Sequence, residues 1–143
     1  MACTPAAGAL QAPMAPSDTR SVHLLAELRE CRSAFLDDED HVVAVMRTAA
    51  EAARATVKEV VVHHYAPQGV AGVLLLAESH MSVHTWPEHA YVSVDVFTCG
   101  DCDPDAAIPV LAEGFGAARV ELTRVVRGLA GLPEVSQPVV TRR

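Results

Sequence analysis

The stretch ESHMSVHTWPEHAYVSVDVFTCG (residues 78–100) decides the fold of this 143-residue chain. In its second half, valines recur at every other position (92, 94 and 96), with polar or aromatic residues between them. Such alternation predicts a β-strand with one buried face, here over Tyr91–Thr98. Met81–Thr85 predicts a second strand, joined to the first through Pro87-Glu88-His89. Paired strands lie only about 5 Å apart, so we expect the ionisable side chains of this stretch to converge.

The flanking segments predict two helices and further strands. Asp37 can cap a helix that begins near residue 37, and Pro104 suits the first turn of a second helix, which Pro109 would shorten or kink. Helical spacing predicts one buried stripe of Val42, Val45, Met46, Ala49, Ala50 and Ala53. The other strands are expected over Ser21–Leu28, Val57–Tyr65, Val70–Ala77 and Arg119–Arg127. This order predicts an α+β two-layer sandwich, an antiparallel sheet with two helices on one face.

The chain is expected to form one domain over residues 20–128. Residues 1–19 are rich in Ala, Pro and Ser, lack the basic and apolar regions of a signal peptide, and are interpreted as a disordered leader. Residues 129–143 are interpreted as a loose C-terminal tail. With no targeting signal, a cytoplasmic location is expected.

Composition narrows the possible partners. The chain has 11 Lys and Arg against 18 Asp and Glu, a net charge of −7, which argues against nucleic-acid binding. No apolar run approaches the roughly 20 residues that a membrane-spanning helix needs. We therefore expect neither a nucleic-acid nor a membrane partner.

Three motifs carry a resemblance to a known family. Glu78-Ser79-His80, His84-Thr85-Trp86-Pro87-Glu88 and Asp95-Val96-Phe97-Thr98-Cys99-Gly100 resemble the signature of the prokaryotic S-adenosylmethionine decarboxylase proenzymes, over roughly residues 20–128. The resemblance implies self-cleavage between Glu78 and Ser79, with Ser79 becoming a pyruvoyl cofactor that forms a Schiff base with S-adenosylmethionine. The products would be carbon dioxide and decarboxylated S-adenosylmethionine, the aminopropyl donor for spermidine. The resemblance also implies a homodimer, stacked in four αββα layers with sites near the interface.

The same resemblance assigns individual roles. His84 is the implied proton acceptor in self-cleavage, and Cys99 the implied proton donor in catalysis. Glu88 would bind the ribose hydroxyls of the substrate, and Tyr65, where the family usually has phenylalanine, would stack on adenine. His80 and His89 are competing candidates for the processing base, although an isolated histidine on a strand is most often structural.

Two departures from the family pattern keep alternatives open. Ala71 stands where the family usually has a serine that hydrogen-bonds in the processing site, and the first strand carries Ser21-Val22-His23 instead of Gly-Arg-His or Gly-Lys-His. The alternatives are a pyruvoyl-dependent arginine or ornithine decarboxylase, and a non-processing homologue that binds a ligand or partner.

The spacing Cys99-Gly100-Asp101-Cys102 raises a third alternative, a small zinc or redox protein. The chain has no second Cys-x-x-Cys pair and no thioredoxin-like βαβ context. No metal site is therefore expected.

Overall fold

The structure is a computed structural model that describes residues 19–143, so almost all of the predicted leader lies outside the described residues. The strands are β1 (Ser21–Arg29), β2 (Val57–His64), β3 (Val70–Leu76), β4 (Ser79–Trp86), β5 (Tyr91–Cys99), β6 (Arg119–Arg127), β7 (Glu134–Val135) and β8 (Val139–Arg142). The helices are α1 (Ser33–Leu36), α2 (Glu39–Ala52) and α3 (Ala107–Gly114), with 3-10 turns η2 (Pro87–His89) and η3 (Pro104–Ala106).

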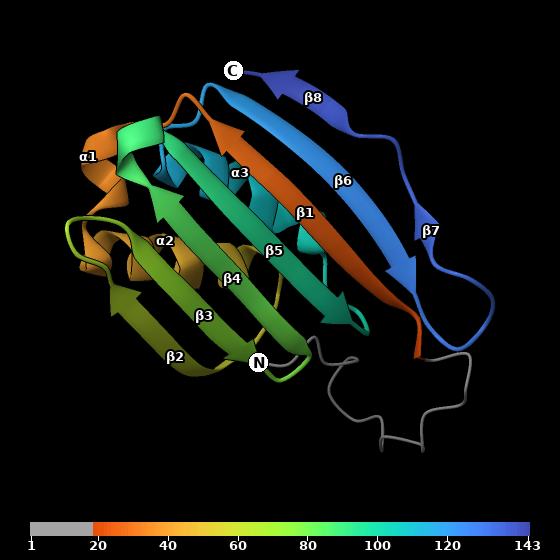
Figure 1. Ribbon diagram of the computed structural model, residues 1–143. Coiled ribbons are helices and arrows are strands. Elements are labelled where there is room, and N and C mark those ends of the chain that lie inside the picture. The colour runs from red at the N-terminus through yellow and green to blue at the C-terminus, as the bar shows by residue number, and fades with distance from the viewer. Residues whose placement is uncertain (1–18) are drawn as a thin grey trace.

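The strands form one antiparallel sheet in the order β2-β3-β4-β5-β1-β6-β7, with β8 also paired to β6. Helices α2 and α3 lie behind the sheet and leave its other face uncovered (Figure 1). The predicted α+β two-layer sandwich is therefore confirmed. Among residues 19–143, no helix is both long and apolar enough to cross a membrane.

The core lies between the sheet and the helices, where the predicted patterns place it. The β5 residues Val92, Val94 and Val96 are buried, and all six residues of the predicted helical stripe are buried with them. Gly72 on β3 allows close approach, because an added Cβ would come within 2.9 Å of the Met46 sulfur on α2. Apolar burial of this kind is the main favourable term in folding.

The start of α2 corrects one prediction. Asp38, not Asp37, caps the helix, since its side chain accepts a hydrogen bond from the His41 amide. Asp37 Oδ1 instead accepts from the Gly69 amide at 2.8 Å and contacts His64 Nε2 at 2.7 Å. Asp37 thus ties the segment before α2 to the turn between β2 and β3.

A buried threonine secures the same end of the sheet. Thr85 Oγ1 accepts a hydrogen bond from the Val70 amide at 2.8 Å and donates one to the Leu36 carbonyl at 2.6 Å. A buried hydroxyl that loses such partners leaves polar groups unsatisfied, so this pair of bonds fixes α1 against β3 and β4.

Two further segments differ from expectation. Pro109 lies in the first turn of α3, where a missing amide proton breaks no intrahelical bond, and 3-10 turn η3 precedes that helix.

In the C-terminal segment, β7 and β8 pair with β6, although every residue of both strands is exposed. A strand with no buried face lacks the alternation by which sequence patterns reveal strands.

The Asp37 contacts predict a pH-dependent contribution to stability. The hydrogen bond from the Gly69 amide, and then that from His64, hold the pKa of Asp37 below its ordinary value of 3.8. Its contribution is therefore present above pH 3.8 and lost as the pH falls through the lower folded-state value. We expect Asp37→Asn to lower Tm at pH 6, with the gap to wild type closing in strong acid. Asp38→Asn is the matched control and should change Tm little, because asparagine caps helices as well as aspartate. A gap that stays constant down to pH 2 would contradict the prediction.

Candidate active site

Ser79 begins β4 in an unusual backbone conformation. Its φ angle is +156°, a region that residues other than glycine rarely occupy. On a regular strand, neighbouring side chains point to opposite faces. At this position the alternation is broken, and Ser79 Oγ lies 3.1 Å from Nδ1 of the next residue, His80.

The peptide carbonyl that precedes Ser79 is held by a thiol. Cys99, at the end of β5, donates a hydrogen bond from Sγ to the Glu78 carbonyl oxygen at 3.0 Å. The Glu78 side chain is buried, and its Oε2 accepts a hydrogen bond from the Thr56 amide at 3.3 Å. A hydroxyl beside a carbonyl that already accepts a hydrogen bond is an arrangement suited to acyl transfer. The structure thus brings together three of the predicted residues, Glu78, Ser79 and Cys99.

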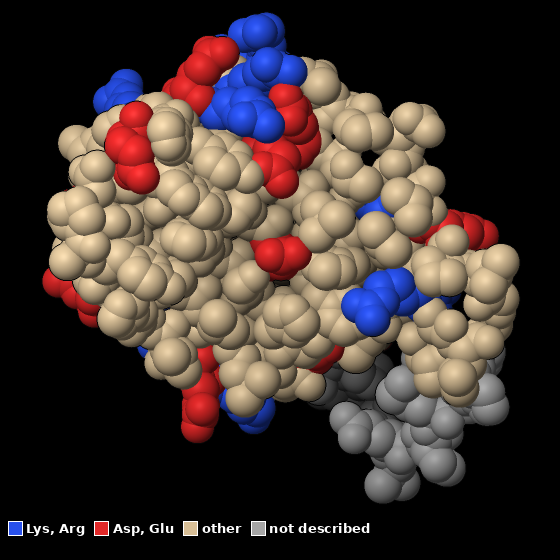
Figure 2. All heavy atoms as spheres, viewed as in Figure 1, with Lys and Arg blue, Asp and Glu red and all other residues tan. Residues whose placement is uncertain are grey.

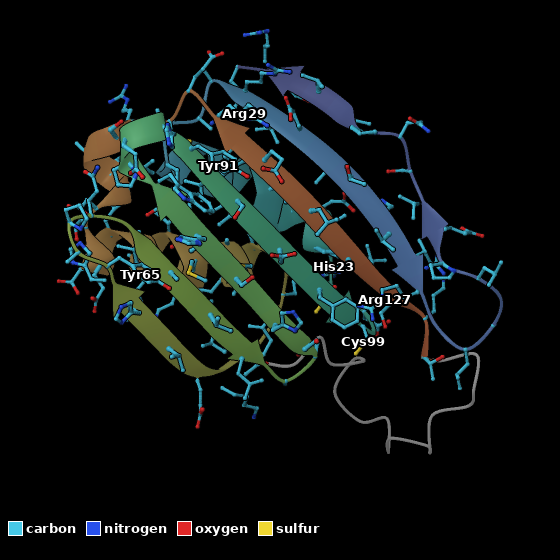
Figure 3. All side chains as sticks on the ribbon, viewed as in Figure 1. His23, Arg29, Tyr65, Tyr91, Cys99 and Arg127 are labelled. Atoms are coloured by element: carbon cyan, nitrogen blue, oxygen red, sulfur yellow. The ribbon has the colours of Figure 1, made fainter. Side chains whose placement is uncertain are left out.

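Phe97 of β5 lies near Ser79 on the open face of the sheet, which is the face that helices α2 and α3 leave uncovered. Its ring lies 5.5 Å from the ring of His80 and 5.3 Å from that of His23, while the Arg127 guanidinium stands 4.7 Å from its centroid. His23, Arg127 and Cys99 gather at the same end of the sheet in Figure 3.

Asp95 adds a polar pair beside this ring. Its Oδ1 lies 3.0 Å from His23 Nε2, and its Oδ2 accepts a hydrogen bond from Ser82 at 3.1 Å. The sequence analysis assigned no role to Phe97, Asp95, His23 or Arg127. Alternation in β5 places Asp95 and Phe97 on the open face, but their partners come from β4, β1 and β6, and no local pattern reveals the registers of these strands.

An aromatic row occupies the open face at the opposite end of the sheet. The imidazole of His84 stacks between Tyr65, at 5.5 Å, and Trp86, at 3.9 Å. Trp86 stacks in turn on Tyr91 at 5.0 Å, and the Tyr91 hydroxyl donates a hydrogen bond to the Glu27 carboxylate. Burial, and then this carboxylate, raise the pKa of Tyr91 to about 12, so its hydroxyl stays protonated at neutral pH.

The predicted substrate-binding residues lie at this second end. Tyr65 directly follows β2, and Glu88 is exposed in turn η2, directly after β4. Ala71, the departure from the family pattern, is the register partner of His84 across β3 and β4. One end of the sheet therefore carries Tyr65, Ala71, His84 and Glu88.

Within one chain, the residues around Ser79 and the residues around His84 lie apart. Ser79 and His84 are five residues apart on the same strand, which separates their backbones by roughly 16 Å at the rise of an extended chain. Tyr65 and Cys99 lie toward opposite ends of the sheet in Figure 3. The expected convergence holds for Ser79 and Cys99 but not for His84, whose role stays a prediction.

Two free thiols among residues 19–143 lie in different surroundings. Across residues 19–143, no group of three or more His, Cys, Asp or Glu side chains is arranged to hold a metal ion. Cys31 is a free thiol whose pKa burial raises to about 11, so it carries no thiolate at neutral pH. Cys99 is also a free thiol, and it is less buried.

In this α+β sandwich a hydroxyl, a thiol and a hydrogen-bonded peptide carbonyl meet at one strand end, an arrangement suited to acyl chemistry on the protein's own backbone. Comparison with known proteins specifies the family. Residues 22–128 match the family model described as S-adenosylmethionine decarboxylase. The chain therefore belongs to the S-adenosylmethionine decarboxylase family.

Individual relatives cover most of the chain. An S-adenosylmethionine decarboxylase proenzyme of Bacillus cereus is 43% identical over 121 residues, which are 84% of this chain and 92% of that protein. One from Syntrophomonas wolfei is 45% identical over 113 residues, 78% of this chain and 90% of that protein. The crystal structure of the adenosylmethionine decarboxylase from Aquifex aeolicus VF5 is 32% identical with a TM-score of 0.72, covering 84% of this chain and 99% of that one.

The His84–Trp86 stack predicts a spectroscopic signature. Trp86 is the single tryptophan of the chain, so its fluorescence reports on this end of the sheet alone. We expect His84→Ala to change the emission intensity of the folded protein, because it removes a ring 3.9 Å from the indole. His80→Ala, on the same strand but near the other end, is the control and should leave the emission as in wild type. Equal spectra for wild type and His84→Ala would show that the stack does not persist in solution.

Proposed function

We propose that this chain is a self-processing, pyruvoyl-dependent S-adenosylmethionine decarboxylase. The observation that carries the proposal is the environment of the Glu78–Ser79 peptide, where the Cys99 thiol donates to the Glu78 carbonyl at 3.0 Å. Membership of a family whose relatives are named proenzymes supports it. The proposed product would supply aminopropyl groups for spermidine, and we propose that the chain acts in the cytoplasm.

Self-processing needs only groups of the chain and one molecule of water. Ser79 Oγ attacks the Glu78 carbonyl carbon, and the peptide amide is replaced by an ester. A base then removes the Ser79 α-proton, and the α-carboxylate of Glu78 leaves with the Ser79 oxygen, which gives a dehydroalanine at residue 79. The dehydroalanine tautomerises to an imine, which water hydrolyses to a pyruvoyl group with release of ammonia. The residues present fit this group, because the unfavourable φ of Ser79 and the thiol on the Glu78 carbonyl both favour reaction at this bond.

The remaining site residues bind substrate and move one proton. The pyruvoyl group supplies an electron sink for decarboxylation, the chemistry that pyridoxal phosphate supplies in other enzymes. We assign to Cys99, whose Sγ donates to the Glu78 carbonyl beside residue 79, the delivery of a proton to the substrate α-carbon after carbon dioxide leaves. Tyr65 offers an aromatic face for adenine, and Glu88 a carboxylate for the two ribose hydroxyls.

A homodimer supplies what one chain lacks. Because Ser79 and His84 stand roughly 16 Å apart on one extended strand, an intrachain proton transfer between them is out of reach. A second copy, packed with its strands reversed over the open face, would bring its own His84, Tyr65 and Glu88 toward Ser79. Each complete site would then combine two chains.

The open face has the character of such an interface. Most of the side chains it presents are neither acidic nor basic, and the charged ones gather mainly at its margins (Figure 2). On β2 and β3 it exposes apolar side chains that a monomer would leave in water, among them Val61, 64% exposed, with Val73 and Leu75. Large apolar patches of this kind mark surfaces that bind another protein.

The proposed function predicts self-cleavage. Denaturing electrophoresis and intact mass should show two chains, residues 1–78 and 79–143, with the second beginning in a pyruvoyl group. Ser79→Ala should abolish both fragments, because it removes the attacking oxygen. Ser82→Ala is the matched control on the same strand and should leave cleavage intact. A wild-type chain that stays whole after long incubation would favour the non-processing homologue.

The proposed function also predicts the substrate. A hydrogen bond to a charged group contributes about 1.5–3 kcal/mol, so Glu88→Gln should lower kcat/KM for S-adenosylmethionine by roughly ten- to a hundredfold without slowing self-cleavage. Carbon dioxide release should be measured from S-adenosylmethionine, arginine and ornithine. Turnover of arginine or ornithine, but not of S-adenosylmethionine, would support the proposed decarboxylation and contradict the proposed substrate.

A further inference from the structure

We propose that His80 is the general base of the first step of self-processing, taking the proton from Ser79 Oγ as that oxygen attacks the Glu78 carbonyl. This inference rests on the proposed function and divides its proton transfers between two histidines. His80 serves the attack on the peptide bond, and His84 of a second copy serves the later removal of the α-proton.

The contact between Ser79 and His80 is not one that a strand provides by default. Adjacent side chains on a regular strand face opposite ways, so a serine hydroxyl cannot reach the next residue's imidazole. The φ of +156° at Ser79 removes this obstacle and places Oγ 3.1 Å from Nδ1. In the tautomer that carries its proton on Nε2, Nδ1 accepts the hydroxyl hydrogen. The same backbone distortion thus places a base beside its nucleophile.

No other described residue fills this role. Within residues 19–143, His80 is the one side chain that hydrogen-bonds the Ser79 hydroxyl. The chain's own His84 is roughly 16 Å away along β4. The Cys99 thiol faces the Glu78 carbonyl oxygen as a donor, where it can stabilise negative charge but not accept the serine proton.

Phe97 holds the imidazole in place. The two ring centroids are 5.5 Å apart, and Phe97 is itself in contact with Arg127 and His23. An aromatic neighbour restricts ring rotation and excludes water from one face, which keeps Nδ1 directed at the hydroxyl. Phe97 is accordingly a positioning residue for His80.

The conversion of the peptide bond to an ester needs no reactant from outside the chain. The Ser79 Oγ–H bond breaks, its proton passes to His80 Nδ1, and the oxygen lone pair forms a bond to the Glu78 carbonyl carbon. The carbonyl π electrons move onto the Glu78 oxygen, beside the Cys99 thiol. When this oxygen reforms its double bond, the C–N bond breaks, and the Ser79 nitrogen receives the proton from the imidazolium. The products are an ester at Oγ, a free α-amine and a neutral imidazole.

The experiment separates the two steps by testing whether the uncleaved chain holds a peptide bond or an ester between residues 78 and 79. Full-length variants are made by cell-free synthesis and followed by intact mass, with and without hydroxylamine, which cleaves an ester but not a peptide bond. His84→Ala should accumulate a chain that hydroxylamine cuts between residues 78 and 79. His80→Ala should form fragments at least about a hundredfold more slowly, as expected on loss of a general base, and its whole chain should resist hydroxylamine. The variant that combines His80→Ala with His84→Ala should resist hydroxylamine as well.

Two additions distinguish a catalytic role from a structural one. His80→Phe keeps an aromatic ring against Phe97 and should be as slow as His80→Ala, while millimolar free imidazole should accelerate His80→Ala and not His80→Phe. His89→Ala, an exposed histidine in η2, is the control and should cleave as wild type.

Normal cleavage by either folded His80 variant, or an ester that accumulates in one, would overturn the assignment and leave the proposed function standing. A wild-type chain that neither cleaves nor responds to hydroxylamine would overturn both.

Discussion

The rise of an extended strand, about 3.3 Å per residue, is the constraint on which the rest of this site depends. It places Ser79 at the start of β4 and His84 roughly 16 Å further along, so no side-chain rotation can bring them together. The structure therefore separates into an end that carries the reactive peptide bond and an end that carries stacked aromatic rings. Every role proposed for His84, Tyr65 or Glu88 requires a second chain, and the open, mostly uncharged face of the sheet is where it would pack.

The reactive end is organised before any bond breaks. Ser79 is held at a φ angle that costs energy, and the fold maintains it because β4 is paired on both sides from its first residue. Hydrogen bonds fix the Glu78 carbonyl through Cys99 and the Glu78 carboxylate through Thr56. Preorganised groups need little rearrangement as charge develops, which is the main way proteins accelerate acyl transfer. Cleavage would then release backbone strain and leave Cys99 beside residue 79.

Sequence patterns predicted the parts of this molecule that follow periodicity. Alternating valines placed β5 and its buried face, and the stripe from Val42 to Ala53 placed α2 against the sheet. The motifs around Ser79 and Cys99 also identified two residues that the fold brings together. Each of these depends on local spacing, which a sequence displays directly.

What the sequence could not predict depends on long-range register or on single backbone angles. Asp37 and Asp38 are equally good caps by type, and only the position of the β2–β3 turn decides that Asp37 binds Gly69. The His80 contact needs a positive φ at Ser79, which no propensity indicates for serine. The stack of His84 between Tyr65 and Trp86 needs the pairing of three strands, and β7 and β8 bury no face that a pattern could reveal.

Complementation between two inactive chains tests the composite site most directly. One chain carries Ser79→Ala and keeps His84, the other carries His84→Ala and keeps Ser79, and different tags allow mixed dimers to be isolated. The account predicts that the His84→Ala chain, unable to complete cleavage alone, is cut between residues 78 and 79 in the mixed dimer, while the Ser79→Ala chain stays whole. A His84→Ala chain that remains uncut in verified mixed dimers, or that is cut at the wild-type rate without a partner, would contradict it.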